Sequence, residues 1–139
     1  MKAISLRPEW AHLVLCGEKT IECRSWQTDY RGDILICSSA MKRKGCISGH
    51  GLIVAELVDI HRFTKDDLEE ACMDELPNGT QYAWVLDNFK DIKPFELKGK
   101  LKLFDVDDSL IEFLPEAQTE AGADAAYKMY WEPLFSKVV

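Results

Sequence analysis

One predicted strand carries the residue types in this sequence that could do chemistry. Period-two alternation over residues 20–26 places Glu22, Arg24 and Trp26 on one face of that strand. Side chains two residues apart on one face are separated by roughly 6.6–7 Å along the strand, so Glu22 and Arg24 can contact one ligand or each other. Lys19 precedes the strand, in a loop position from which its ammonium group can reach the same face.

Two interpretations of this set follow from its residue types. In the first, Lys19 acts as a base or activates a nucleophile, and Glu22 is its proton partner. In the second, Glu22 and Arg24 form an ordinary ion pair on the surface of the sheet, which contributes little to stability. Spacing alone leaves both interpretations open.

Residues close to this strand could bind a ligand. Arg31 lies in a turn and offers a planar guanidinium that suits a phosphate group. Trp26, Tyr30 and Trp84 have ring faces on which a nucleobase can stack. The alternative for these aromatic residues is packing in the core or at its rim, which is their more common role.

Charge is distributed unevenly along the chain. The net charge is −7, from 17 basic and 24 acidic residues, which argues against a protein that coats nucleic acid over its whole surface. Residues 1–44 nevertheless carry eight basic and five acidic residues, a net charge of +3, and the remainder carries −10. This asymmetry indicates a local anion-binding face in the first third, or an acidic remainder that keeps the domain soluble.

Several classes of protein lack support in the sequence. The five cysteines are odd in number and show no CxxC spacing, so we expect neither a disulfide framework nor a metal site. No P-loop and no GxGxxG motif occurs, and we expect no cofactor. The absence of a long apolar run and of a secretory leader predicts a cytoplasmic protein without a membrane partner.

The order of predicted elements favours an α+β fold in a single domain of residues 1–139. Strands outnumber helices and do not alternate with them, which favours a small mixed β-barrel with flanking helices over a doubly wound sheet. A proline at position 94 is expected to interrupt the strand that begins at Tyr82. The strands are predicted at 2–6, 20–26, 34–37, 52–63, 82–86 and 100–106, and the helices at 8–16, 64–73 and 116–131.

Residues 2–106 resemble the ASCH domain family. The resemblance rests on Pro8-Glu9-Trp10-Ala11, Gly17-Glu18-Lys19-Thr20-Ile21-Glu22-Cys23-Arg24, Trp26, Tyr30-Arg31-Gly32, Ser38-Ser39, Tyr82-Ala83-Trp84-Val85-Leu86 and Lys98-Gly99-Lys100-Leu101. It implies a barrel similar to the PUA fold and a cleft that binds RNA. By this match Lys19, Glu22 and Arg24 are the candidate catalytic residues. The candidate ligand-binding residues are Trp26, Tyr30, Arg31, Ser39 and Trp84.

The resemblance also implies two possible activities. Some relatives are amidohydrolases that deacetylate acetylated cytidine with the motif lysine, a threonine and a further carboxylate. Here Glu22 occupies the threonine position, and the carboxylate would fall within residues 69–75, where the sequence does not choose among the acids. Other relatives are reported to cut RNA, a reaction compatible with the Lys-Glu-Arg set.

Three hypotheses therefore stand, in this order. The first is an ASCH domain that binds RNA, or a nucleoside or nucleotide-like ligand, in a cleft lined by the Lys-Glu-Arg set. The second is a hydrolase acting in the same cleft, as a ribonuclease or, less favoured, as an amidohydrolase on acylated cytidine. The third is a protein-interaction module that uses the acidic remainder and the helix near the C-terminus. The sequence leaves the oligomeric state open, as well as the role of the extension 107–139.

Overall fold

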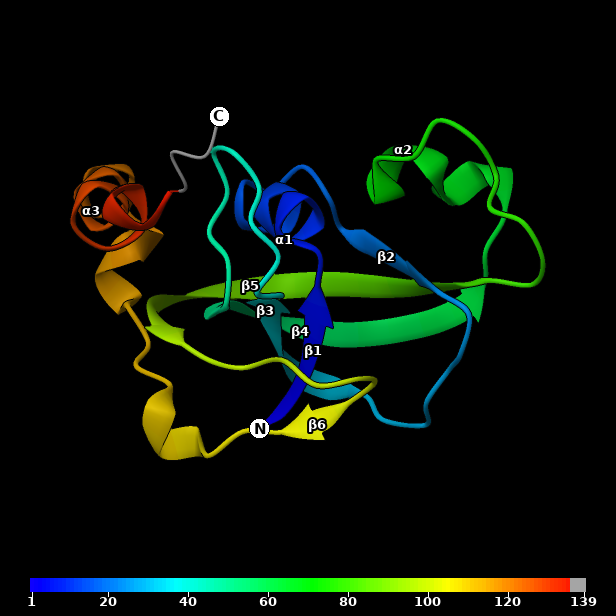
Figure 1. The fold of residues 1–139 in the computed structure, drawn as a ribbon, viewed down its shortest axis with the longest axis horizontal. Coiled ribbons are helices and arrows are strands. Elements are labelled where there is room, and N and C mark those ends of the chain that lie inside the picture. The colour runs from blue at the N-terminus through cyan, green and yellow to red at the C-terminus, as the bar shows by residue number, and fades with distance from the viewer. Residues whose placement is uncertain (136–139) are drawn as a thin grey trace.

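The strands of this protein form one mixed sheet with helices against it (Figure 1). The computed structural model describes residues 1–135. The strands are β1 (Lys2–Leu6), β2 (Ile21–Arg24), β3 (Gly32–Ser38), β4 (His50–Arg62), β5 (Tyr82–Glu96) and β6 (Phe104–Asp105). The helices are α1 (Pro8–Leu15), α2 (Leu68–Ala71) and α3 (Glu120–Ala126).

The α+β class is confirmed, but closure of the sheet into a barrel is not. The six strands lie in the order β2-β5-β4-β3-β1-β6, and only β1 and β3 run parallel. The terminal strands of this order, β2 and β6, do not pair with each other anywhere in residues 1–135. The described sheet is therefore open, with β2 at one edge.

The core lies where α1 covers the sheet, on the same side as α2 (Figure 1). Pro8 begins α1 at a position where its missing N–H costs no hydrogen bond, and Ala11 and Val14 are buried against the sheet. The apolar run Ile34–Cys37 in β3 is buried on both faces, as its lack of alternation predicts. Fully burying one such aliphatic side chain contributes about 1.5–3 kcal/mol.

Two strand predictions are wrong. Strand β5 continues through Pro94, because the proline falls where the pairing register between β4 and β5 shifts, and β2 pairs only with residues 82–85 of β5. The predicted strand 100–106 is reduced to β6, and the preceding residues form a loop in which Leu101 is 93% exposed. That loop faces the site described below.

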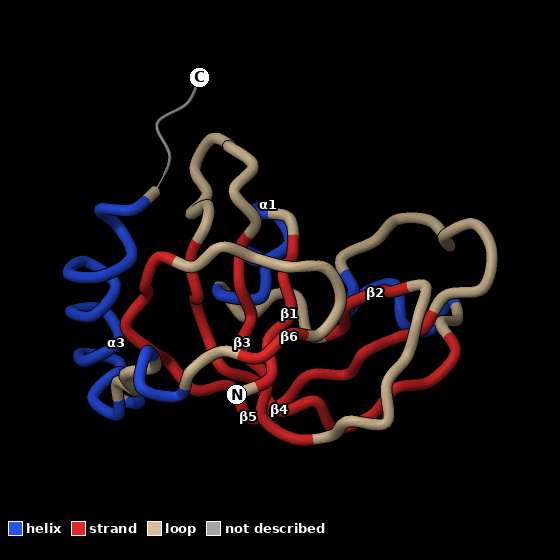
Figure 2. Tube along the Cα trace, turned by 60° about the horizontal axis from the view of Figure 1, so that its bottom comes forward, coloured by secondary structure: helices blue, strands red, loops and turns tan. Residues whose placement is uncertain are grey.

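The predicted helix at 116–131 is present as a succession of short helical segments. A 3-10 turn at Pro115–Gln118 leads into α3, and a π-helical turn follows at Tyr127–Trp131. Figure 2 shows this segment beside one end of the sheet, and Ala117, Ala126 and Trp131 join the same core cluster as α1. Within residues 1–135, no helix combines the length and apolar character that a membrane span requires.

Candidate functional site

Lys19 lies in the turn that follows α1, and it is buried although lysines in turns are usually exposed. Gly17 ends the helix with φ 81°, a backbone conformation that favours glycine, and turns the chain toward β2. The Lys19 side chain is only 2% exposed, and its Nζ donates a hydrogen bond to the backbone oxygen of Ala71 at 2.7 Å. The same ammonium lies 5.1 Å from the ring centroid of Trp10.

Glu22 joins Lys19 to Arg24, and we call these three residues the triad. Its Oε1 lies 3.5 Å from Lys19 Nζ, and its Oε2 lies 2.9 Å from Arg24 Nη2. Arg24 Nε donates a hydrogen bond to Oε2 at 3.1 Å, and Arg24 Nη2 donates one to the backbone oxygen of Ser5. Because Glu22 is 8% exposed, two cations compensate a carboxylate that water hardly reaches.

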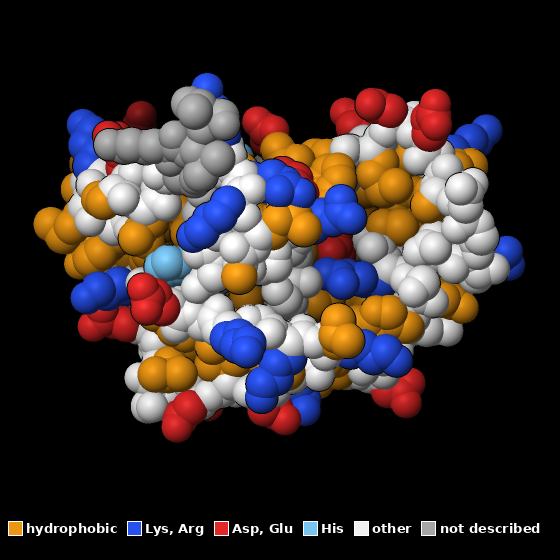
Figure 3. Space-filling model, in the orientation of Figure 1, with side chains coloured by type: hydrophobic (Ala, Val, Ile, Leu, Met, Phe, Trp, Pro, Cys, Tyr) orange, Lys and Arg blue, Asp and Glu red, His pale blue; other side chains and the backbone are white. Residues whose placement is uncertain are grey.

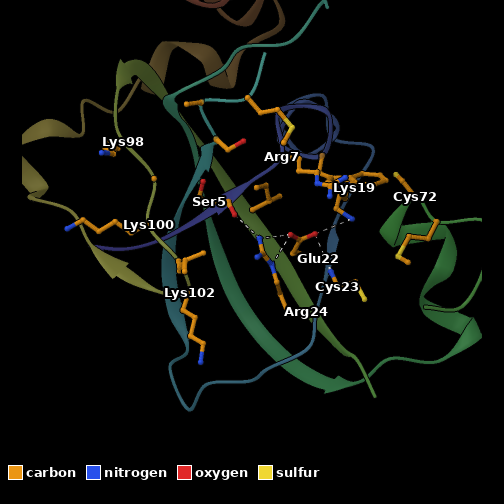
Figure 4. Close-up of a pocket in the computed structure, with 18 of the residues that line it drawn as sticks. Ser5, Arg7, Lys19, Glu22, Cys23, Arg24, Cys72, Lys98, Lys100 and Lys102 are labelled. Carbon is orange, nitrogen blue, oxygen red and sulfur yellow. Dashed lines mark hydrogen bonds and ion pairs between the residues drawn. The ribbon is translucent and has the colours of Figure 1, made fainter. Parts of the chain in front are cut away.

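The triad lies at the floor of a cleft of about 970 Å³ (Figure 4). One wall comes from Arg7 and Trp10 at the start of α1, and another from the residues that follow α2, Cys72 to Glu75. Across from the triad, the loop with Lys98, Lys100 and Lys102 completes the cleft (Figure 4).

The lining of this cleft is basic, although the chain is acidic. Six basic side chains and three carboxylates line it, which gives a net charge of +3 in a chain of −7. Figure 3 shows basic side chains gathered on this face of the molecule, and acidic side chains above α2. The basic side chains are Arg7, Lys19, Arg24, Lys98, Lys100 and Lys102, and the carboxylates are Glu22, Asp74 and Glu75.

Among the predicted ligand-binding residues, Ser39 lines the cleft. Its hydroxyl oxygen is buried and has no hydrogen-bond partner within residues 1–135. A buried hydroxyl without a partner is costly, so a ligand group that bonds to it would be stabilised there.

The other four predicted ligand-binding residues do not line the described cleft. Trp84 is buried, its Nε1 donates to the backbone oxygen of Trp26 at 3.1 Å, and the two rings pack edge to face. The hydroxyl of Tyr30 donates to the backbone of Asp33. Arg31 donates to two backbone oxygens of its own turn. These contacts position β2 and the turn that follows it.

The Cys23 thiol lines the cleft and has a raised pKa. Burial, and next the Glu22 carboxylate, raise the pKa of the Cys23 thiol above its ordinary value. A protonated thiol is a weak nucleophile and a poor metal ligand. In the part of the chain that the structure describes, no three His, Cys, Asp or Glu side chains gather closely enough to hold a metal ion.

Sequence reasoning missed the far side of the cleft. Arg7 and the lysines at 98, 100 and 102 were not predicted as site residues, and the loop reaches the cleft only through tertiary structure. In the sequence, Lys100 and Lys102 alternate with Leu101 and Leu103, a pattern that equally predicts the exposed face of a strand. For the carboxylate expected within residues 69–75, the structure places Asp74 and Glu75 in the lining.

Comparison with known proteins agrees with this fold. The family model of the ASCH domain matches residues 4–98. The crystal structure of ASCH from Zymomonas mobilis superposes with a TM-score of 0.60 at 18% identity, covering 93% of this chain and 94% of that chain. The crystal structure of a serine-to-alanine variant of the Zymomonas mobilis protein superposes with a TM-score of 0.62 at 20% identity, covering 80% of this chain and 96% of that chain. No match is found among curated proteins.

Proposed function

The chain belongs to the ASCH domain family, and we propose that it binds RNA, or a nucleotide-like ligand, in the cleft floored by the triad. The observation that carries this proposal is the concentration of basic side chains around the cleft of an acidic chain. Phosphate groups are attracted to such a surface, and an acidic remainder discourages binding elsewhere.

The cleft offers both parts of a nucleotide a suitable contact. Arg24 uses Nε and Nη2 within the protein, which leaves its Nη1 N–H groups for a phosphate oxygen. Trp10 and the exposed Leu101 supply apolar surface for a base or a sugar. The volume of about 970 Å³ is sufficient for a nucleotide.

The internal pairing of the triad favours binding over catalysis. Glu22 Oε1 accepts from the Cys23 backbone N–H and faces Lys19, while Oε2 accepts from Arg24 Nε and forms an ion pair with Arg24 Nη2. A carboxylate that is already paired within the protein and is 8% exposed has little surface left to contact a substrate. We therefore assign the triad a role in forming a positively charged floor.

Fluorescence anisotropy with a labelled single-stranded RNA at low salt tests this proposal. Changing Lys98, Lys100 and Lys102 together to Gln should weaken binding at least tenfold, since losing about 1.4 kcal/mol of binding free energy has that effect. The matched control changes Lys65, Lys90 and Lys128 to Gln, which alters the net charge equally but lies outside the cleft lining. Equal affinities of the two variants would contradict the proposal. The same titrations with nucleosides test the nucleotide-like ligand.

A hydrolase in the same cleft is the second candidate, because Asp74 and Glu75 bring further carboxylates to it. These acids are exposed, unlike Glu22, and either could move a proton. Lys19→Met, which keeps the length of the buried side chain, should abolish cleavage of RNA or deacylation of an acylated cytidine. If the wild-type protein turns over neither substrate, or if Lys19→Met retains full turnover, this candidate is wrong.

A further inference from the structure

A second cavity, of about 280 Å³, lies between the end of α1, strand β5 and the C-terminal helical segment. Its lining shares no residue with the basic cleft. The residues that matter for its chemistry are Asp91 from β5, Tyr127 and Trp131 from the π-helical turn, and Phe135. The function proposed for the cleft makes no use of these residues.

Asp91 is the charged residue of this cavity. Its carboxyl group is half-buried, and burial alone raises the pKa of Asp91 above its ordinary value. Among the described residues, the lining includes neither Lys nor Arg. A partly desolvated carboxylate without a counter-ion is stabilised by any cation that enters the cavity.

Three aromatic rings stand around the same space. The rings of Tyr127 and Phe135 lie 5.7 Å apart at an angle of 43°. Trp131 is 4% exposed, and its Nε1 N–H has no acceptor within residues 1–135. Aromatic faces attract cations, and organic ammonium groups are favoured because they are weakly hydrated. The unpaired N–H would additionally bond to an acceptor atom carried by the ligand.

We propose that this cavity binds a small quaternary ammonium ligand, with Asp91 as its counter-ion and the rings of Tyr127, Trp131 and Phe135 as its cage. A trimethylammonium group fits the aromatic lining, because it needs no hydrogen bonds from the protein. A hydroxyl or carbonyl a few bonds away on the ligand accepts from Trp131. Choline has this chemistry as a free molecule, and a trimethyllysine side chain carries the same cationic group.

The test is calorimetric or NMR titration of the full chain with choline and with 3,3-dimethylbutan-1-ol, a neutral molecule of the same shape. We expect choline to bind at least tenfold more tightly than the neutral molecule, and Asp91→Asn to remove that preference. Equal binding of the two molecules, no binding of choline, or an unchanged preference in Asp91→Asn would each overturn the proposal.

A second variant and a second ligand complete the test. Tyr127→Leu changes a partly exposed ring, so it should weaken choline binding while the protein stays folded. Lys102→Gln, in the basic cleft, should leave choline binding unchanged. A trimethyllysine peptide should also bind, and Asp91→Asn should weaken its binding as it weakens that of choline. If the peptide binds more tightly than choline, the natural source of the cation is a protein side chain. RNA binding should be unaffected by Asp91→Asn.

Discussion

The buried lysine of the triad depends on two acceptors that come from different parts of the chain. Lys19 Nζ contacts the Glu22 carboxylate on β2 and the backbone oxygen of Ala71 at the end of α2. Removing one partner of a buried ion pair leaves a charge without compensation, and this costs more than the pair itself contributes. Single substitutions in the triad should therefore lower the free energy of unfolding more than substitutions that remove both members of an ion pair.

Glu22→Gln should lower the free energy of unfolding by about 3 kcal/mol, because Lys19 and Arg24 lose their shared carboxylate. Adding Lys19→Met should restore part of that loss, since the buried charge is removed as well. Urea denaturation measures both. The control is Lys128→Met, which breaks an exposed ion pair with Asp124 and should change stability by less than about 0.5 kcal/mol. A Glu22→Gln effect as small as the control's would contradict this account.

At the residue scale, the sequence predicts that Glu22 and Arg24 lie close together, because residues of one strand face share a direction, and it places Lys19 in a loop from which its side chain can reach them. It does not predict the burial of Lys19, which depends on α2 closing over it with the carbonyl of Ala71. Nor does it predict that Trp84 is enclosed: alternation shows which residues share a face, and the tertiary structure decides what covers that face.

At the scale of elements, α2 is too short to be stable by itself, and the 3-10 turn Lys65–Asp67 that leads into it is capped. Thr64 and Asp67 form a reciprocal capping box, and His61 at the end of β4 contacts Asp59 and Asp67, each at 2.9 Å. Hydrogen bonds with Asp59 and then Asp67 raise the pKa of His61 above 6.5. Burial alone would raise the pKa of Asp67, but the Thr64 N–H and His61 lower it below 3.8.

His61→Gln should lower the free energy of unfolding more at about pH 6 than at about pH 9. Since the folded protein raises the pKa of His61, its stabilising contribution is complete below 6.5 and is lost as the pH rises through the folded-state value. The contribution of Asp67 is lost only as the pH falls below 3.8, outside this window. Urea denaturation at the two pH values measures the difference.

The control for this contact is the background in which Asp59 and Asp67 are both changed to Asn. In that background, His61→Gln should have the same small effect at both pH values, because the imidazolium no longer faces negative charges. A loss of stability in the wild-type background that does not vary with pH would contradict a charged contact at His61.

Elements are predicted from the sequence where local pattern decides them. Helix α1 is marked by Pro8 and Gly17, and β3 by its apolar run. The extent of β5 and the loop before β6 were not predicted, because a register shift accommodates Pro94 and because alternating Lys and Leu residues are also compatible with an exposed loop. The extent of β5 and the length of β6 depend on which strands pair with them, and sequence periodicity does not reveal pairing partners.

At the scale of the whole molecule, the segment after residue 106 contributes to the main core. Leu114, Ala117 and Trp131 belong to the same buried cluster as residues of β1 and α1. Deleting 116–139 would therefore disturb folding and would not isolate a role in binding other proteins. Substitution of the exposed Met129, which lies outside the lining of the second cavity, is the better test of the protein-interaction hypothesis.

Leu114→Ala should lower the free energy of unfolding by about 2–5 kcal/mol, the usual cost of truncating a buried leucine. Leu110→Ala is a matched control in the same segment, because Leu110 is 51% exposed whereas Leu114 is 4% exposed. The control should change stability by less than about 0.5 kcal/mol. Thermal or urea denaturation that finds the two variants equal would show that this segment is not part of the core.

The contrast between a basic cleft and an acidic chain should also appear in the salt dependence of the RNA binding that we propose. Each phosphate neutralised on a single strand contributes a slope of about −0.7 to log K against log salt concentration. Three lysines that each contact one phosphate would give a slope of about −2. The variant with Lys98, Lys100 and Lys102 changed to Gln should lose most of this slope, whereas a slope unchanged by that variant would place the phosphate contacts elsewhere.

The position of β2 at the edge of the sheet has a consequence for how the cleft moves. Strand β2 pairs with β5 alone, whereas β3 is held by strands on both sides. Edge elements open in fluctuations that leave the interior strands intact, and their amides exchange with solvent sooner. Hydrogen exchange should therefore be faster for the amides of Glu22 and Arg24 than for those of Ile34–Ile36, and bound RNA should slow the former selectively. Such a result would indicate that the floor of the cleft opens locally while the core strands stay intact.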